Sequence, residues 1–163
     1  MLITNEKVKR KKEKSFSKFV LSFVIYISIV GGIVFGVPRF LVWWLQTPYP
    51  MAAITSGSMW PALREGSLVF VQGVARDDIQ VDDIVVYQNE GGRGFTIHRV
   101  VRMDHDKIVT KGDANFAEDK PVAYERIVGR ALTWFGRPVG IPFLGSITVL
   151  ANNLQKEKEI KIK

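Results

Sequence analysis

The stretch FVLSFVIYISIVGGIVFGVP, from Phe19 to Pro38, is twenty residues long and has no charged side chain. An α-helix rises about 1.5 Å per residue, so a helix of this length spans roughly the ~30 Å hydrocarbon layer of a membrane. Lys18 and Arg39 bracket the stretch, and apolar residues resume after Arg39 as far as Leu45. We therefore predict a transmembrane anchor over residues 19–45.

The charges beside this stretch predict its orientation. Residues 1–18 carry seven Lys or Arg, whereas only Arg39 lies close to the other end. The positive-inside rule then keeps residues 1–18 in the cytoplasm as a basic tail and places the rest of the chain outside it. A cleaved signal peptide would share the basic start, but its apolar region has ~7 to 15 residues and precedes small residues. This run is longer and leads into Trp43 and Trp44, which favours a retained anchor.

The formal charge of +7 comes from the two ends of the chain. Residues 19–155 contain twelve basic and twelve acidic residues, and a charged tail follows over residues 156–163. A neutral body does not imply a phosphate-binding face, so nucleic acid is not an expected partner. The chain has no cysteine, which excludes disulfides and thiol catalysis.

Beyond Pro50 the pattern changes to short segments rich in Val, Ile and aromatic residues, each bounded by turn formers or charges, which is typical of strands. We expect strands at Ser67 to Val74, Asp83 to Gln88, Gly94 to Met103, Lys107 to Thr110 and Ile127 to Phe135. Asn89 to Gly94 is expected to connect two of them, and Asp104 to Lys107 to form a hairpin turn. The fold class is therefore mainly β, with one N-terminal transmembrane helix and a compact, mostly antiparallel β domain over residues 46–155.

Three residue types in this domain suggest proton transfer, although each has an ordinary structural explanation. ITSGSMWPAL, Ile54 to Leu63, contains Ser-Gly-Ser, which alone would be interpreted as a turn. Of the two histidines, His105 lies between two aspartates in a predicted turn, as a solvated side chain would, whereas His98 lies within a strand. No second His or Cys stands at metal-ligand spacing, so we expect no metal. A serine hydroxyl needs a neighbouring base, and the base benefits from a carboxylate, for which TKGDANFAED offers Asp113 and Asp119.

Four segments in order, SGSMWP, DDIVVY, TIHRVV and KGDANFAED, resemble the successive boxes of type I signal peptidases after their membrane anchor. They are most similar to the branch of archaea, the endoplasmic reticulum and some spore-forming bacteria, in which the general base is His. Most bacterial enzymes have Lys at the position of His98. The resemblance covers about Thr55 to Arg130. The family usually has Gly where this chain has Asp82, a difference that affects a turn.

The resemblance implies a role for each matching residue. Ser58 would be the nucleophile and His98 the base, with Asp119 preferred for orienting His98 and Asp113 supporting the site. The Ser58 N–H and the Ser56 hydroxyl would form the oxyanion hole. Substrate would pair with Tyr49 to Thr55 as an added strand, and the residues expected to line its shallow pockets are Met51, Ala53, Val86 and Tyr87. Val139 to Leu150 is too short for the second membrane segment of some relatives, so we expect a single span.

These inferences predict a membrane-anchored serine endopeptidase that needs no cofactor and removes signal peptides after small residues. Its partners would be the signal peptides of preproteins and the lipid bilayer, with accessory subunits left open, and it would lie in the cell membrane or the endoplasmic reticulum. Two alternatives stay open. A related peptidase that cuts itself or a regulator would normally use Lys and lack an anchor, and a non-enzymatic β binding module would need no Ser, His and Asp set.

Overall fold

The structure is a computed structural model and describes residues 18–92, 94–146 and 150. The predicted basic tail, apart from Lys18, and the predicted C-terminal tail lie outside these residues. The chain divides into two units, one ending at Leu41 and the other beginning at Val42. Each unit is described by itself.

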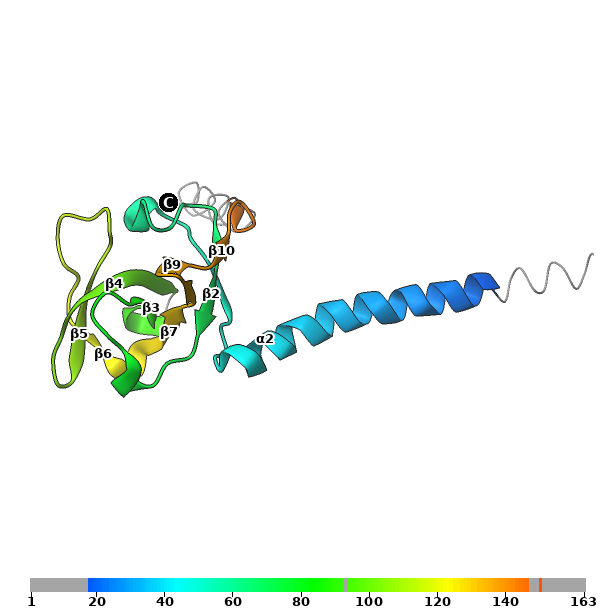
Figure 1. The fold of residues 1–163 in the computed structure, drawn as a ribbon, viewed down its shortest axis with the longest axis horizontal. Coiled ribbons are helices and arrows are strands. Elements are labelled where there is room, and N and C mark those ends of the chain that lie inside the picture. The colour runs from blue at the N-terminus through cyan, green and yellow to red at the C-terminus, as the bar shows by residue number, and fades with distance from the viewer. Residues whose placement is uncertain (1–17, 93, 147–149, 151–163) are drawn as a thin grey trace, which may run out of the picture. The chain divides into compact units, whose positions relative to one another are not determined.

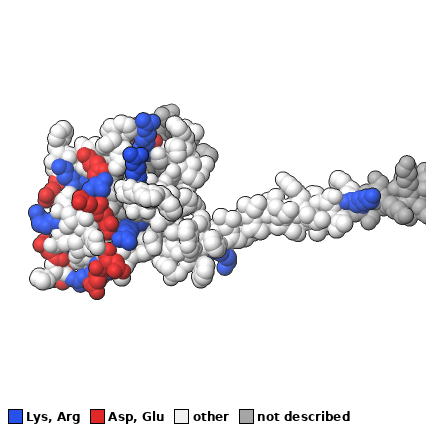
Figure 2. Space-filling model, in the orientation of Figure 1, with Lys and Arg blue, Asp and Glu red and all other residues white. Residues whose placement is uncertain are grey.

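The first unit is helical and apolar. The helix Lys18–Leu45 has a mean hydropathy of 2.5 and, within the described residues, is the one helix long and apolar enough to cross a membrane. Most of its side chains are exposed, whereas Leu45 at its end is buried, and Figure 2 shows hardly any charge along its length. The helix widens into a π-turn at η1 (Gly32–Gly36) before α2 (Val37–Leu45). Pro38 has no backbone N–H, so the regular hydrogen-bond ladder cannot continue unchanged across this point.

The second unit is an antiparallel β domain (Figure 1). Its strands are β1 (Met51–Ala53), β2 (Leu68–Gln72), β3 (Ile84–Gln88), β4 (Phe95–Met103), β5 (Lys107–Lys111), β6 (Val122–Ala123), β7 (Ile127–Ala131), β8 (Thr133–Trp134), β9 (Arg137–Pro138) and β10 (Gly140–Ile141). An eight-stranded sheet has the order β1-β2-β7-β3-β4-β5-β6, with β10 also paired to β2, and β8 pairs with β9. The predicted fold class is confirmed.

Strand β3 fixes the core because both of its faces are buried. Its sequence IVVYQ is a continuous apolar run, which is typical of a strand covered on both sides. Ile84 and Val86 belong to one apolar cluster, whereas Val85 and Tyr87 belong to the other. Successive side chains of a strand point to opposite faces, so one strand serves both clusters.

The remaining differences from the sequence-based expectation concern short elements. The strand expected from Ile127 to Phe135 is interrupted at Leu132, whose N–H donates to the Phe70 carbonyl, and it continues as β8. The hairpin turn is where it was expected, with the Asp104 N–H donating to the Lys107 carbonyl at 2.8 Å. Strands β1, β6, β9 and β10 were not predicted. Of the segment from Val139 to Leu150, residues 147–149 lie outside the described part.

Figure 2 shows both signs of charge mixed over one part of the visible face of the β domain, while the rest of that face is largely uncharged. This agrees with the neutral composition of the body of the chain. Several of the charges are paired at the surface, as Arg102 is with Glu118 at 3.6 Å and Arg126 with Glu90 at 3.5 Å. Exposed pairs of this kind contribute little to stability, so the apolar clusters carry the fold.

Gly129 in β7 offers a test of this packing. A Cβ at this position would lie 2.3 Å from the Gln72 carbonyl oxygen and 2.9 Å from Val71 Cγ1. We therefore expect Gly129→Ala to lower the free energy of unfolding by about 1–3 kcal/mol, as overpacking usually does. Urea unfolding of the full chain in detergent, followed by tryptophan fluorescence, measures the change.

Gly57→Ala is the matched control, because a Cβ there meets nothing within 4 Å. Equal stability losses in the two variants would contradict the packing described for β7.

Candidate active site

Ser58 lies in a short 3-10 helix, η2 (Gly57–Met59), which is held in place by a buried side chain and by backbone hydrogen bonds. Met59 is 1 % exposed in the core, and its carbonyl accepts a hydrogen bond from the Leu63 N–H at 2.8 Å. The carbonyl of Ser58 accepts a hydrogen bond from the Ala114 N–H, also at 2.8 Å. The backbone of Ser58 is therefore fixed, while its side chain remains half-buried at a groove.

The hydroxyl of Ser58 meets two polar side chains. Its Oγ is 3.2 Å from His98 Nε2 and 3.1 Å from the Ser56 hydroxyl. His98 is 7 % exposed and lies within β4. A buried imidazole needs hydrogen-bond partners on both nitrogens, and Ser58 supplies one of them.

Asp119 supplies the other partner. Its Oδ2 is 2.5 Å from His98 Nδ1 and also accepts hydrogen bonds from Thr110 Oγ1 at 2.7 Å and from the Tyr87 hydroxyl at 3.3 Å. The sheet register explains this convergence. Tyr87 lies across from Thr96, and Thr110 across from Val100, which places both residues on the same face of the sheet as His98.

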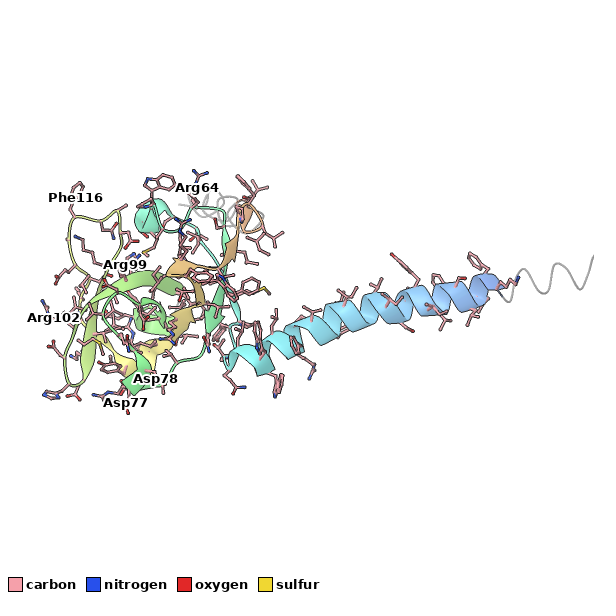
Figure 3. All side chains as sticks on the ribbon, in the orientation of Figure 1. Arg64, Asp77, Asp78, Arg99, Arg102 and Phe116 are labelled. Carbon is pink, nitrogen blue, oxygen red and sulfur yellow. The ribbon has the colours of Figure 1, made fainter. Side chains whose placement is uncertain are left out.

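Asp113 is placed differently. It forms a two-pronged ion pair with Arg99, with Arg99 Nε 2.8 Å from Oδ1 and an Arg99 terminal nitrogen 2.7 Å from Oδ2. These hydrogen bonds to Asp113 raise the pKa of Arg99. Neighbouring residues of a strand face opposite ways, so His98 and Arg99 lie on opposite faces of β4 (Figure 3 labels Arg99). The structure brings Asp119 and not Asp113 to His98.

The segment before Ser58 and the start of β4 form a groove of about 630 Å³. Three of the four expected substrate-binding residues line it, namely Met51, Ala53 and Val86. The rings of Tyr49 and Phe95, which also line the groove, lie 4.8 Å apart. The further residues that line it are Ala52, Ile54, Thr55, Ser56, Ser58, Met59, Gly94, Thr96, Ile97, His98 and Asn115.

Tyr87 requires a correction, because it does not belong to the described lining of the groove. It is 6 % exposed and lies behind Asp119 in the core cluster. Burial raises the pKa of the Tyr87 phenol, and the Asp119 carboxylate acts in the same direction, so the hydroxyl remains a hydrogen-bond donor. Val86, its neighbour on the opposite face of β3, lines the groove instead.

Two residues at the site were missed from the sequence. Thr110 is fully buried and bonds to Asp119, and Asn115 lines the groove. Both lie close to the Gly-Asp turn that contains Asp113, but nothing in their spacing distinguishes them from structural residues.

His105 is exposed in the turn between β4 and β5. Among the described residues no group of three or more metal-ligating side chains is found.

No family model matches the chain. The signal peptidase complex catalytic subunit sec11 of the fungus Pyrenophora tritici-repentis is 35 % identical over 125 residues, which cover 72 % of each chain. The signal peptidase complex catalytic subunit SEC11C of Homo sapiens is 31 % identical over 122 residues, covering 67 % of this chain and 60 % of the relative. The chain belongs to the Sec11 family of type I signal peptidases.

Membership of the Sec11 family confirms the resemblance seen in the four sequence boxes. The relatives are named as catalytic subunits, so this is a family of hydrolases. The polar cluster of Ser58, His98 and Asp119 therefore lies in a domain that belongs to an enzyme family.

The hydrogen bond between Thr110 and Asp119 can be tested through stability. Thr110→Val keeps the side-chain shape but removes the donor at 2.7 Å from the carboxylate. Hydrogen bonds to charged groups contribute about 1.5–3 kcal/mol, so we expect a loss of that order in the free energy of unfolding. Denaturant titration of the full chain in detergent measures it.

Thr110→Ser retains a hydroxyl and should keep most of the stability. A valine variant as stable as the wild type would show that the donor does not matter at this position.

Proposed function

We propose that this protein is a membrane-anchored serine endopeptidase that removes N-terminal signal peptides from secreted preproteins, cutting after small residues. The observation that carries the proposal is the continuous chain of contacts from Ser58 through His98 to Asp119 at the wall of a groove. Membership of the Sec11 family supports the substrate class. A non-enzymatic binding module, the alternative, would not require Ser58, His98 and Asp119 to be hydrogen-bonded in this order.

In the proposed reaction His98 acts as the general base. A proton held on Nδ1 by Asp119 leaves the Nε2 lone pair directed at Ser58, 3.2 Å away. Ser58 Oγ attacks the substrate carbonyl carbon while Nε2 takes the hydroxyl proton, and the proton then passes to the departing amine. Water, activated by the same nitrogen, hydrolyses the acyl-enzyme and restores the serine. Asp119 stabilises the transient imidazolium throughout.

Two donors are proposed for the oxyanion of the tetrahedral intermediate. The Ser58 backbone N–H is fixed by the anchoring of η2, and the Ser56 hydroxyl lies 3.1 Å from the nucleophile. Ser56 has an extended backbone, with φ of −149° and ψ of 163°. Donors that are already oriented stabilise the developing charge without reorganising during the reaction.

The groove fits a substrate that binds as an extended strand. Strand β1 pairs with β2 along one edge and ends the order of the sheet, so its other edge can accept a further strand. Met51, Ala53 and Val86 would form the shallow apolar pockets for small side chains before the cut. Tyr87 has a different role in this proposal, because its hydroxyl helps to hold Asp119.

Residues 19–45 are proposed as the anchor, with residues 46–155 as the peptidase domain outside the cytoplasm. The basic residues of 1–18 support this orientation through the positive-inside rule. The substrates would be signal peptides that lie in the same bilayer. The relatives are named as subunits of a signal peptidase complex, which supports the presence of accessory subunits here. The membrane would be the cell membrane, or that of the endoplasmic reticulum in a eukaryote.

Replacing the nucleophile tests the reaction. Ser58→Ala should abolish cleavage of a preprotein by the purified full chain while the fold persists, because only a hydroxyl is lost. Ser56→Ala should lower kcat by up to ~10²- to 10³-fold and leave residual activity, as loss of one oxyanion donor does. Mass determination of the products measures both rates and locates the cut.

The two histidines provide a matched control. His98→Ala should lose nearly all activity, whereas His105→Ala should cleave at the wild-type rate because His105 is exposed in a turn. Full activity in Ser58→Ala or in His98→Ala would overturn the proposed mechanism.

The orientation is tested by protease protection. Protease added outside intact cells or to the lumenal side of vesicles should digest the β domain, while an epitope placed at residues 1–18 stays protected. The reverse pattern would place the groove on the side where preproteins are not yet translocated, and would contradict the proposed function.

A further inference from the structure

Asn115 is a polar residue of the groove that the reaction described above does not use. It is the one lining residue contributed by the described segment between Gly112 and Asp119. Among the other polar side chains that line the groove, those of Ser56, Ser58, His98 and Thr96 form hydrogen bonds, whereas those of Tyr49 and Thr55 form none with the described residues. The Asn115 amide forms none with the residues that the structure describes. A primary amide offers two donors and an acceptor, so it is free to bind a ligand.

The backbone holds the Asn115 amide near the main chain of Ser58. The Asn115 N–H donates to the Gly112 carbonyl at 2.9 Å, and the adjacent Ala114 N–H donates to the Ser58 carbonyl. A Cβ at Gly112 would lie 2.7 Å from Asn115 Nδ2 and 2.7 Å from the Ser58 carbonyl oxygen. Asn115 Nδ2 and the Ser58 carbonyl oxygen therefore both lie close to Gly112, and a side chain at this position would collide with both of them.

The position of this segment indicates which part of a substrate Asn115 would meet. Strand β1 and the start of β4 line the part of the groove that is proposed to hold residues before the cut. The segment of Asn115 instead joins the partner of the Ser58 carbonyl to Asp119, the partner of His98. In the proposed reaction the imidazole protonates the departing amine, so the chain after the cut leaves on the histidine side.

We propose that the side-chain amide of Asn115 binds the peptide backbone of the first residues after the cleaved bond. It would donate to a backbone carbonyl and accept from a backbone N–H, which together match the two kinds of group on the amide. Binding to backbone groups suits this position, because the residues after the cut belong to many different proteins. The inference rests on the proposed function and deepens it.

The test compares two substrates of equal length. One is a peptide that spans the cut, and the other replaces the two peptide bonds after the cleaved bond by esters, which removes two N–H groups and weakens the carbonyl acceptors. For the wild-type full chain in detergent we expect the ester substrate to lose about 3- to 10-fold in kcat/KM, as for one or two hydrogen bonds. In Asn115→Ala the ordinary peptide should lose a similar factor, and the two substrates should differ less than twofold.

Phe116→Ala is the control variant, since the Phe116 side chain is fully exposed at the loop tip and outside the groove lining (Figure 3). It should retain the wild-type difference between the two substrates. An Asn115→Ala enzyme that keeps the full difference, or shows no loss on the ordinary peptide, would overturn the inference about Asn115. A wild-type protein that cleaves neither substrate would instead overturn the proposed function.

Discussion

The carboxylate of Asp119 is the group on which the arrangement of the site depends. One oxygen, Oδ2, accepts hydrogen bonds from His98 on β4, Thr110 on β5 and Tyr87 on β3. A partly buried charge is tolerated only where several donors replace water. Because these donors come from three adjacent strands, the site is in place only when the centre of the sheet has its native register. The proposed base is thus oriented by the fold as a whole and not by a local loop.

The nucleophile depends on a second, separate support. The side chain of Met59 is buried in the apolar core, and the Ser58 carbonyl is bound by the backbone of Ala114. The same short segment, from Gly112 to Asp119, therefore contacts the peptide of Ser58 at its start and His98 at its end. Rigid placement of both groups keeps them at hydrogen-bond distance before a substrate arrives, which lowers the entropy cost of reaching the reactive geometry.

Features with a local cause could be predicted from the sequence, and features set by long-range pairing could not. The apolar helix follows from composition alone, and strand β3 from its continuous apolar run. Strand β1 has only three residues and no β-branched one, so its existence depends on pairing with β2. Thr110 meets Asp119 because the Asp119 N–H donates to the Thr110 carbonyl, and the register between β4 and β5 places Thr110 on the His98 face; no pattern within either segment specifies this. The order of the four sequence boxes indicated Ser58 and His98 and favoured Asp119 over Asp113 for orienting His98, whereas the pairing of Asp113 with Arg99 depends on the alternation along β4 and on the path of the next loop.

The alternation along β4 also limits how the length of this chain can change during evolution. His98 and Arg99 are neighbours that face opposite ways, each towards its own aspartate. One residue inserted or deleted in β4 before His98, with no bulge to absorb it, would turn a guanidinium towards Ser58 and the imidazole away from it, since a shift of one residue reverses every side chain of a strand. In the connection between β3 and β4 the described residues, 89–92 and 94, belong to no strand, so a change of length there does not reverse the faces of β4. A change of length is therefore tolerable between Gln88 and Phe95, whereas within β4 it has to be absorbed by a bulge, as the register shift opposite β5 between Val100 and Arg102 shows.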